Sequence, residues 1–407
     1  MSENDRATKV AKVPAAKFGG KGLTIGIAVA AAVTVLGLVM WGMQLTGGFM
    51  DTDMRDFNPW GLSIALFMFF VGLSVGSMVG ATAPGALGLQ GFQGVAKVAT
   101  WTSICCTVLA IGFVVVDLGQ PLRLWELFAY SNLGSPLMWD IIVLAAYLVL
   151  SIVYLWALVR ADKDEAGAKS LRIVSMIVLV WALVVCAVDG WIFGLMPGRE
   201  MWNTALLAPW FISSALASGT ALALVAVIAL RKAGYVALEQ KSLVGLVKLL
   251  GAFVCVDLFF FACDLLTEGF PAGSGADIVA MLTTGALAPF FWIEVLGCAA
   301  TAVIAFVPKL RTSPLIVVSG VLVVIGIFCK RMQLVIGGFQ IPEHDLATFI
   351  TDFTVTGPWS QGLAGAYANI IYTPTLPEIG LALGVIALGV LMVLVGLKAL
   401  PLRSVDE

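Results

Sequence analysis

The sequence predicts an all-α integral membrane protein with about ten transmembrane helices. Of its 407 residues, 60% are hydrophobic and only 12% are charged, and the mean hydropathy is +1.02. This composition is typical of polytopic membrane proteins rather than soluble ones. Apolar runs of the roughly 20 residues that a membrane helix needs lie at 23–45, 60–82, 95–117, 138–160, 171–194, 206–230, 243–265, 288–307, 314–336 and 377–400.

The first apolar run follows a basic leader that resembles the start of a secretory signal. Its apolar part is longer than the 7–15 residues of a signal peptide, which favours an uncleaved first span. Residues 1–45 are therefore predicted to be a cytoplasmic leader and one membrane helix. The basic residues of the leader are Arg6, Lys9, Lys12, Lys17 and Lys21.

Lysine and arginine are distributed unevenly among the connections between the runs. The connections 160–172 and 230–243 hold four and three basic residues, whereas the alternate connections hold only Arg55, Arg123 and Arg199. Basic loops stay in the cytoplasm, so we predict a multi-pass protein of the cell membrane with both termini cytoplasmic. The long segments 117–137, 266–287 and 337–376 are then predicted on the outer face, where a partner protein would dock.

A short sequence occurs twice at an offset of 150 residues. "PWGLSIAL" at 59–66 and "PWFISSAL" at 209–216 are identical at five of eight positions. We therefore predict two parallel four-helix repeats, at 59–196 and 206–340, with one flanking helix at each end; residues 341–407 form an outer segment and the last span. A simpler interpretation is that each Pro-Trp pair starts a helix at the membrane interface.

The sequence gives no sign of a redox cofactor or a metal bound by this chain. Its seven cysteines lie inside the apolar runs without CxxC or CxxCH spacing, which favours their role as small packing residues. The only histidine, His344, lies in the segment 337–376, so no span offers a histidine ligand to haem. We therefore expect no haem, iron–sulfur cluster or metal. The net charge of −2 gives no indication of nucleic acid binding, and membrane lipid is the expected surrounding.

Ionisable residues occur within the predicted spans, where each costs about 2.5–3.5 kcal/mol near the bilayer centre and indicates function by default. All of them fall in the outer half of the predicted membrane region. The competing interpretation is structural, as ion pairs or helix caps. They are Asp117, Asp140 and Asp189 in the first repeat, and Asp257, Asp264, Glu294, Lys330 and Arg331 in the second.

Two stretches resemble the signature of the NrfD/PsrC family of respiratory membrane subunits. They are "DLGQPLRLWELF…NLGSPLMWD" at 117–140 and "GWIFGLMPGREMWNTALLAPWFISSALASG" at 190–219. The ten predicted spans are similar to the longer members of the family, and the resemblance covers roughly residues 58–340. It departs from the family where Cys186 and Phe67 replace histidines that some members carry.

The resemblance implies a membrane subunit that binds quinone or menaquinone as an exchangeable substrate near the outer face. Such a subunit exchanges electrons with a ferredoxin-like iron–sulfur subunit, which is connected to a catalytic subunit, often a molybdopterin enzyme, or to a cytochrome c-type subunit. Whether the chain is itself an enzyme stays open. The resemblance is also compatible with electron transfer that is coupled to proton translocation.

Site residues follow from combining the resemblance with the buried charges. Asp189 is the expected proton acceptor, assisted by Asp117 and Asp140, and Arg123 either balances their charge or holds the loop in shape. Asp189, Trp191, Trp139 and Ser135 are the expected quinone contacts. The second-repeat residues Asp257, Asp264, Glu294, Arg331 and Lys330 form either a proton path or a structural network.

Two other functions fit part of the pattern. A secondary transporter also has repeats and buried carboxylates, but the spans lack paired mid-helix Gly/Pro breaks and the charges gather at one face rather than at the midplane. A purely structural membrane anchor predicts that an Asp189→Asn change leaves quinol-linked turnover intact.

Overall fold

The computed structural model describes residues 20–54, 58–87, 93–161, 165–235, 240–270, 274–340 and 372–402. Ten of its helices are long and apolar enough to cross a membrane, which confirms the predicted class and the number of spans. Most of the predicted outer segment 337–376, with His344, lies outside the described residues. The long helices are α1 (Lys21–Gly47), α2 (Leu62–Leu87), α3 (Gln93–Asp117), α5 (Pro136–Ala161), α6 (Glu165–Gly194), α7 (Leu207–Lys232), α8 (Gln240–Gly269), α10 (Ala288–Phe306), α11 (Ser313–Gln340) and α14 (Leu376–Ala399).

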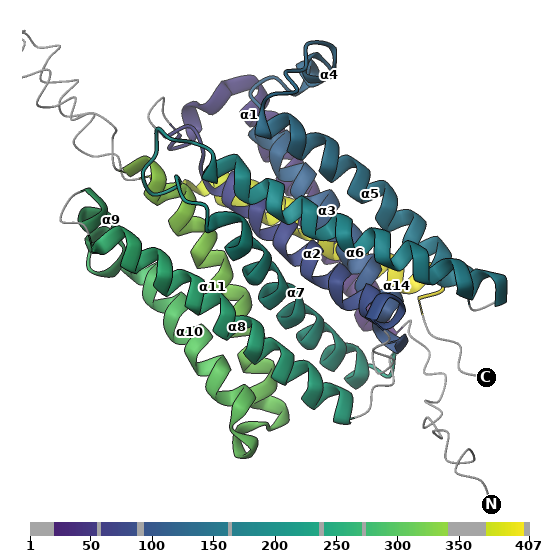
Figure 1. Cartoon of the computed structure of the whole chain (residues 1–407). Helices are drawn as coiled ribbons and strands as arrows, with labels where there is room; N and C mark the ends of the chain where they lie inside the picture. The colour runs from purple at the N-terminus through teal and green to yellow at the C-terminus, as the bar shows by residue number, and fades with distance from the viewer. Residues whose placement is uncertain are drawn as a thin grey trace, which may run out of the picture.

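Eight of these helices form two four-helix bundles (Figure 1). In the first bundle α2 packs on α3, α3 on α5, α5 on α6 and α6 on α2. In the second bundle α7 packs on α8, α8 on α10, α10 on α11 and α11 on α7, so helices in matching order have matching neighbours. The common origin of the bundles as a sequence repeat, and the domain boundaries, stay predictions.

The flanking helices α1 and α14 lie together rather than at opposite ends of the molecule. They pack against each other, and α14 also packs against α3 of the first bundle. Gly37 and Gly384 make this close packing possible, because a Cβ atom on either one would collide with the backbone of the other. Among the described helices, α1 and α14 therefore extend the first bundle.

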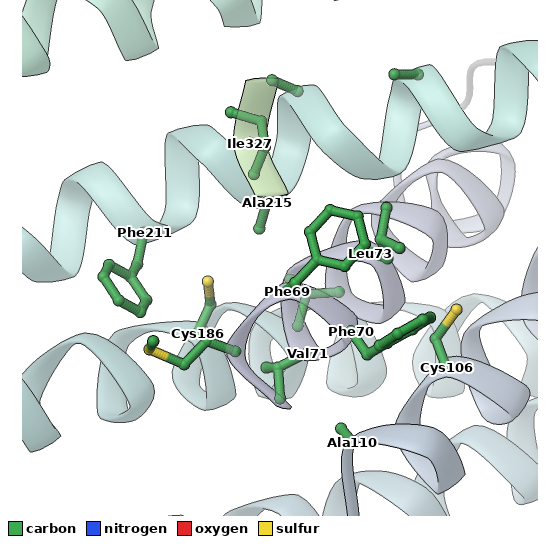
Figure 2. Close-up of a cluster of buried hydrophobic side chains, with 14 of the residues drawn as sticks. Phe69, Phe70, Val71, Leu73, Cys106, Ala110, Cys186, Phe211, Ala215 and Ile327 are labelled. Atoms are coloured by element: carbon green, nitrogen blue, oxygen red, sulfur yellow. The ribbon is translucent and has the colours of Figure 1, made fainter. Parts of the chain in front are cut away.

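The two bundles meet mainly where α2 and α6 pack on α7 and where α2 packs on α11. Gly76 and Gly219 allow α2 and α7 to cross closely, since a Cβ at Gly76 would collide with the carbonyl of Ala215. Figure 2 shows Phe69, Cys186, Ala215 and other buried side chains around this contact. This apolar contact fixes the relative position of the polar residues further along the same helices.

Short helices lie in the connections at one end of the bundles. They are η2 (Gly48–Asp51), η4 (Pro121–Arg123), α4 (Glu126–Ala129) and α9 (Ser274–Thr283), whereas η5 (Pro308–Leu310), between α10 and α11, lies at the opposite end. The helix α9 packs against α8, α10 and α11 and therefore covers part of the second bundle. The connection 118–135 is largely exposed and carries apolar side chains, including Leu122 at 90% and Tyr130 at 79% exposure.

Candidate functional site

One polar group lies inside the second bundle, and we call it the ion-pair cluster: Asp257, Glu294, Lys330, Gln333 and Ser213. Lys330 of α11 pairs with Asp257 of α8 and, at 3.2 Å from Nζ to Oε1, with Glu294 of α10. Ser213 donates a hydrogen bond to Asp257 (3.1 Å), and Gln333 donates one to Glu294 (2.8 Å). Both carboxylates are completely buried. Four helices thus supply partners for charges that would be costly to bury alone.

Aromatic rings surround the cation of this cluster. The Lys330 ammonium lies 4.6 Å from the ring centroid of Trp210 and 5.7 Å from that of Phe261. These two rings are stacked on each other with their centroids 5.2 Å apart. A cation over aromatic faces gains electrostatic energy without water, so the rings stabilise the buried charge of Lys330.

A pocket adjoins the ion-pair cluster. Glu294 and Lys330 line one part of it, and Asp264 and Glu268 of α8 line another. These last two are four residues apart, hence on one face of the helix. Ile278 and Leu282 of α9 also line the pocket. The arrangement brings together all the second-repeat residues that were predicted as a proton path, although the function of this group stays a prediction.

A second polar group lies in the first bundle, and we call it the carboxyl pair: Asp140 of α5 and Asp189 of α6. Their side chains are buried, with 6% and 1% of the residue surface exposed, and they lie within electrostatic reach of each other. Within the described part of the chain, neither carboxyl oxygen of Asp189 has a hydrogen-bond partner, and Oδ1 of Asp140 has none either. A buried carboxyl group without partners is unfavourable, so this pair has hydrogen-bonding capacity that the described residues do not use.

Arg331 connects the two polar groups. It follows Lys330 on α11, and adjacent residues on a helix point about 100° apart, so the two cations can serve different groups. The guanidinium lies 3.7 Å from the ring centroid of Phe211, and its Nη2 donates to Ser214 (2.6 Å). It also lies within electrostatic reach of Asp189, while its Nε has no hydrogen-bond partner among the described residues. Arg331 is therefore within electrostatic reach of Asp189 in the first bundle and of Asp257 and Glu294 in the second.

Asp117 belongs to a different environment. It ends α3 and interacts electrostatically with Glu378 at the start of α14. There the Tyr372 hydroxyl donates to Glu378 (2.6 Å) and accepts from the backbone amide of Leu62 (2.9 Å). Burial, reinforced by the hydrogen bond to Glu378, raises the pKa of Tyr372. The acid that acts electrostatically on Asp117 is thus Glu378 of the last span, and among the described residues no such interaction joins Asp117 to Asp140 or Asp189.

Arg123 is a surface residue in the connection before α5. Its guanidinium makes a two-pronged pair with Glu126, with both hydrogen bonds at 2.8 Å, and two thirds of its side chain is exposed. This hydrogen bonding raises the pKa of Arg123. Because its charge is already paired within its own loop, the geometry favours a role in loop shape over one in balancing the buried acids.

Of the other predicted quinone contacts, Trp139 directly precedes Asp140 on α5 and Ser135 lies just before that helix. Ser135 accepts backbone hydrogen bonds from the first turn of α5, and the Trp139 indole donates to the carbonyl of Leu133 (2.6 Å). Trp191 is 43% exposed. It lies two residues after Asp189, which places the two on nearly opposite faces of α6. Trp191 therefore faces away from the carboxyl pair.

Several residues of the two polar groups escaped the sequence-based prediction. Gln333 lies three residues after Lys330, and this spacing, which places both on one face of α11, is a signal that could have found it. Ser213 and Ser214 lie inside the duplicated "PWFISSAL", but no pattern distinguishes a serine that binds a carboxylate from one that packs. Among the described residues, no group of three or more His, Cys, Asp or Glu side chains is arranged to hold a metal ion.

Known proteins related to this chain share most of its length. A protein of Halobacterium salinarum, provisionally named as a membrane subunit of dimethyl sulfoxide reductase, is 32% identical over 401 residues, covering 93% of this chain and 91% of that protein. The Hdr-like menaquinol oxidoreductase integral membrane subunit of Archaeoglobus fulgidus is 27% identical, covering 94% of each chain. The menaquinone reductase integral membrane subunit of Nitratidesulfovibrio vulgaris is 23% identical, covering 83% of this chain and 89% of that protein.

A family model also matches most of the chain. The family described as "Polysulphide reductase, NrfD" matches residues 51–343, which include both bundles and both polar groups. The matched region also contains the two stretches that carry the resemblance seen in the sequence. This chain therefore belongs to the NrfD family of polysulphide reductase-type membrane proteins.

Proposed function

We propose that this chain is the membrane subunit of a respiratory oxidoreductase complex and that it binds quinone or menaquinone. The names of two relatives support this, since one is a menaquinol oxidoreductase subunit and the other a menaquinone reductase subunit. Electrons pass between the quinone and an iron–sulfur partner subunit, which is wired to a catalytic or cytochrome c-type subunit. The cell membrane is its location, and both termini are cytoplasmic.

The quinone ring binds between α6 of the first bundle and α11 of the second. The observation that carries this assignment is Asp189, which is 1% exposed and has no hydrogen-bond partner for either oxygen among the described residues. Arg331 approaches from the other bundle with an Nε that also lacks a partner there. Asp189 can accept the proton of a quinol hydroxyl, and Arg331 can donate a hydrogen bond to the carbonyl oxygen of the quinone.

Quinol oxidation releases two electrons and two protons. Asp189 takes a proton from a ring hydroxyl as that oxygen becomes a carbonyl, and Arg331 holds the oxygen in place. Asp140, within electrostatic reach, receives the proton next and frees Asp189 for the second one. Both electrons leave to the iron–sulfur partner, so the reaction is balanced. In the direction of quinone reduction the same groups return the protons.

The exposed connection 118–135 is the docking surface for the partner subunit. Its apolar side chains Leu122, Trp125 and Tyr130 are more than half exposed, and Arg123 with Glu126 holds their turn in shape. Exposed aromatic residues are common anchors of protein interfaces. The pocket with Asp264 and Glu268 provides a separate route for protons if turnover is coupled to their translocation.

The first experiment compares oxidation of a short-chain menaquinol analogue by the purified complex with native Asp189 and with Asp189→Asn. We expect kcat/KM to fall by about 10²–10⁴-fold, the usual contribution of a general base, while the partner subunits still co-purify. The matched control is Asp277→Asn, the same change at an exposed position of α9 at the same end of the molecule. Unchanged turnover in Asp189→Asn would contradict the proposed quinone site and favour a purely structural membrane anchor.

A further inference from the structure

A large crevice lies between the two bundles, in the halves of α2 and α7 that are remote from the polar groups. Its walls come from α2, α3, α7 and α8. None of its described lining residues lines the pocket beside the ion-pair cluster. Thr220 on its wall lies six residues, or about 9 Å along the helix, beyond Ser214, which binds Arg331. The crevice is thus a separate space.

Small residues create this space. Gly80, Ala83, Ala99, Ala223 and Ala226 line it, and a Cβ atom added to Gly80 would meet no other atom within 4 Å. None of the lining residues that the structure describes is ionisable. In a bilayer such a space is filled by hydrocarbon, because water has no partners on apolar walls.

Three hydroxyl side chains line the otherwise apolar crevice, those of Ser77, Thr102 and Thr220. Ser77 of α2 lines it and is 2% exposed, and its hydroxyl has no hydrogen-bond partner among the described residues. A buried hydroxyl normally finds a partner. Many serines of this chain bond to a carbonyl of their own helix, as Ser151 does to Tyr147. An unpaired Ser77 therefore points to a ligand that brings an acceptor into the crevice.

The depth of Ser77 decides which ligand fits. Ser77 lies about 22 Å from the first residue of α2 and about 15 Å from the last, at 1.5 Å per residue. This places it well inside a hydrocarbon core about 30 Å thick. The ester carbonyls of a phospholipid stay near the headgroups and cannot reach this depth. A ring carbonyl on an isoprenoid tail can reach it.

We propose that this crevice is a second binding site, for an oxidised isoprenoid quinone whose ring carbonyl accepts a hydrogen bond from Ser77. This site is independent of the one at Asp189. No described lining residue can accept the protons of a quinol, so the crevice binds quinone without oxidising or reducing it. It holds quinone next to the bundle interface, on the side away from the carboxyl pair.

The test uses the purified full-length complex and a photoreactive azido-naphthoquinone with a short isoprenoid tail, with labelled peptides identified by mass spectrometry. Gly80→Leu fills the crevice without a clash at Cβ. Gly245→Leu is the matched control, because Gly245 also has open space around it but does not line the crevice. We expect labelling of α2 and α7 peptides in the native protein and in Gly245→Leu, and its loss in Gly80→Leu.

Ser77→Ala provides a second variant, which removes no hydrogen bond between described residues. We expect the probe concentration that gives half-maximal labelling to rise about fivefold, which corresponds to the loss of one hydrogen bond. Equal labelling of native and Gly80→Leu protein would overturn the proposal. So would mass spectrometry of extracted lipids that finds phospholipid, and no quinone, lost from Gly80→Leu. Asp189→Asn should not change labelling of the crevice. The crevice proposal can therefore be tested even if the proposed role of Asp189 proves wrong.

Discussion

The ion-pair cluster and the carboxyl pair are both buried in the bundles, and both depend on a cation from the same helix, α11. Lys330 in the second bundle contacts two carboxylates directly, and serine and glutamine side chains add hydrogen bonds. Arg331 serves the first bundle from a distance, and both oxygens of Asp189 stay without a hydrogen bond in the described structure. Two neighbouring cations on one helix thus differ: Lys330 is in direct contact with its acids, whereas Arg331 makes no hydrogen bond to Asp189.

The difference teaches that buried charge alone does not identify a reactive site. A cluster in which the cation directly faces both acids stabilises the fold, because removal of one charged member leaves the others uncompensated. A carboxyl group with unused hydrogen-bonding capacity is unfavourable unless something else binds there. We therefore expect a structural role for the ion-pair cluster and a chemical role for the carboxyl pair.

The largest effect is expected from Lys330→Met. Loss of the ammonium leaves Asp257 and Glu294 as unbalanced buried acids, so the free energy of unfolding should fall by about 3–5 kcal/mol. Titration with SDS in mixed micelles measures this. Neutralising all three residues, with Lys330→Met, Asp257→Asn and Glu294→Gln, should recover most of the loss. If it does not, Lys330 acts through its packing on Trp210 and Phe261 instead.

A smaller loss is expected from Arg331→Met. The change removes a charged hydrogen bond to Ser214 and the cation opposite Asp189, which together should lower the free energy of unfolding by about 2 kcal/mol. Adding Asp189→Asn should restore part of it, because the acid no longer needs a balancing cation. Additive losses, within about 0.5 kcal/mol, would show that Arg331 and Asp189 do not interact.

Asp189→Asn alone should change the free energy of unfolding by less than about 1 kcal/mol, since neither oxygen of this residue has a hydrogen bond to lose among the described residues and Arg331 keeps Asp257 and Glu294 within electrostatic reach. Asp257→Asn is the matched comparison, because it breaks a direct ion pair and should cost more. The same SDS titration compares them. Equal losses from both variants would remove the distinction between the two polar groups.

The smallest effect is expected from Arg123→Ala. Its pair with Glu126 is exposed, and exposed pairs contribute little to stability. We expect no measurable change in the free energy of unfolding, but reduced co-purification of the iron–sulfur partner because the loop 118–135 loses its shape. Glu126→Gln is the control that breaks the same pair from the other side. Normal partner recovery in both would place the docking surface elsewhere.

Much of the fold was predictable because hydropathy reports membrane spans directly. The ten apolar runs correspond to ten helices, and the charged residues named from the sequence are largely those of the two polar groups. The flanking helices were harder, since no local pattern places α1 beside α14. The grouping of Asp117 was also missed, because its neighbour Glu378 lies in the last span, far along the chain.

Sequence alone was enough for the class, the number of spans, the family and the depth of each charged residue along its helix. Depth follows from counting residues at a fixed rise. The partner of each charge depended on tertiary packing: Asp257 meets Lys330, 73 positions away, while Asp189 faces Arg331 without a hydrogen bond in the described structure. The direction in which a helix turns each side chain is set by its contacts with other helices, such as the α2–α7 crossing at Gly76. That information is not local to any stretch of the chain.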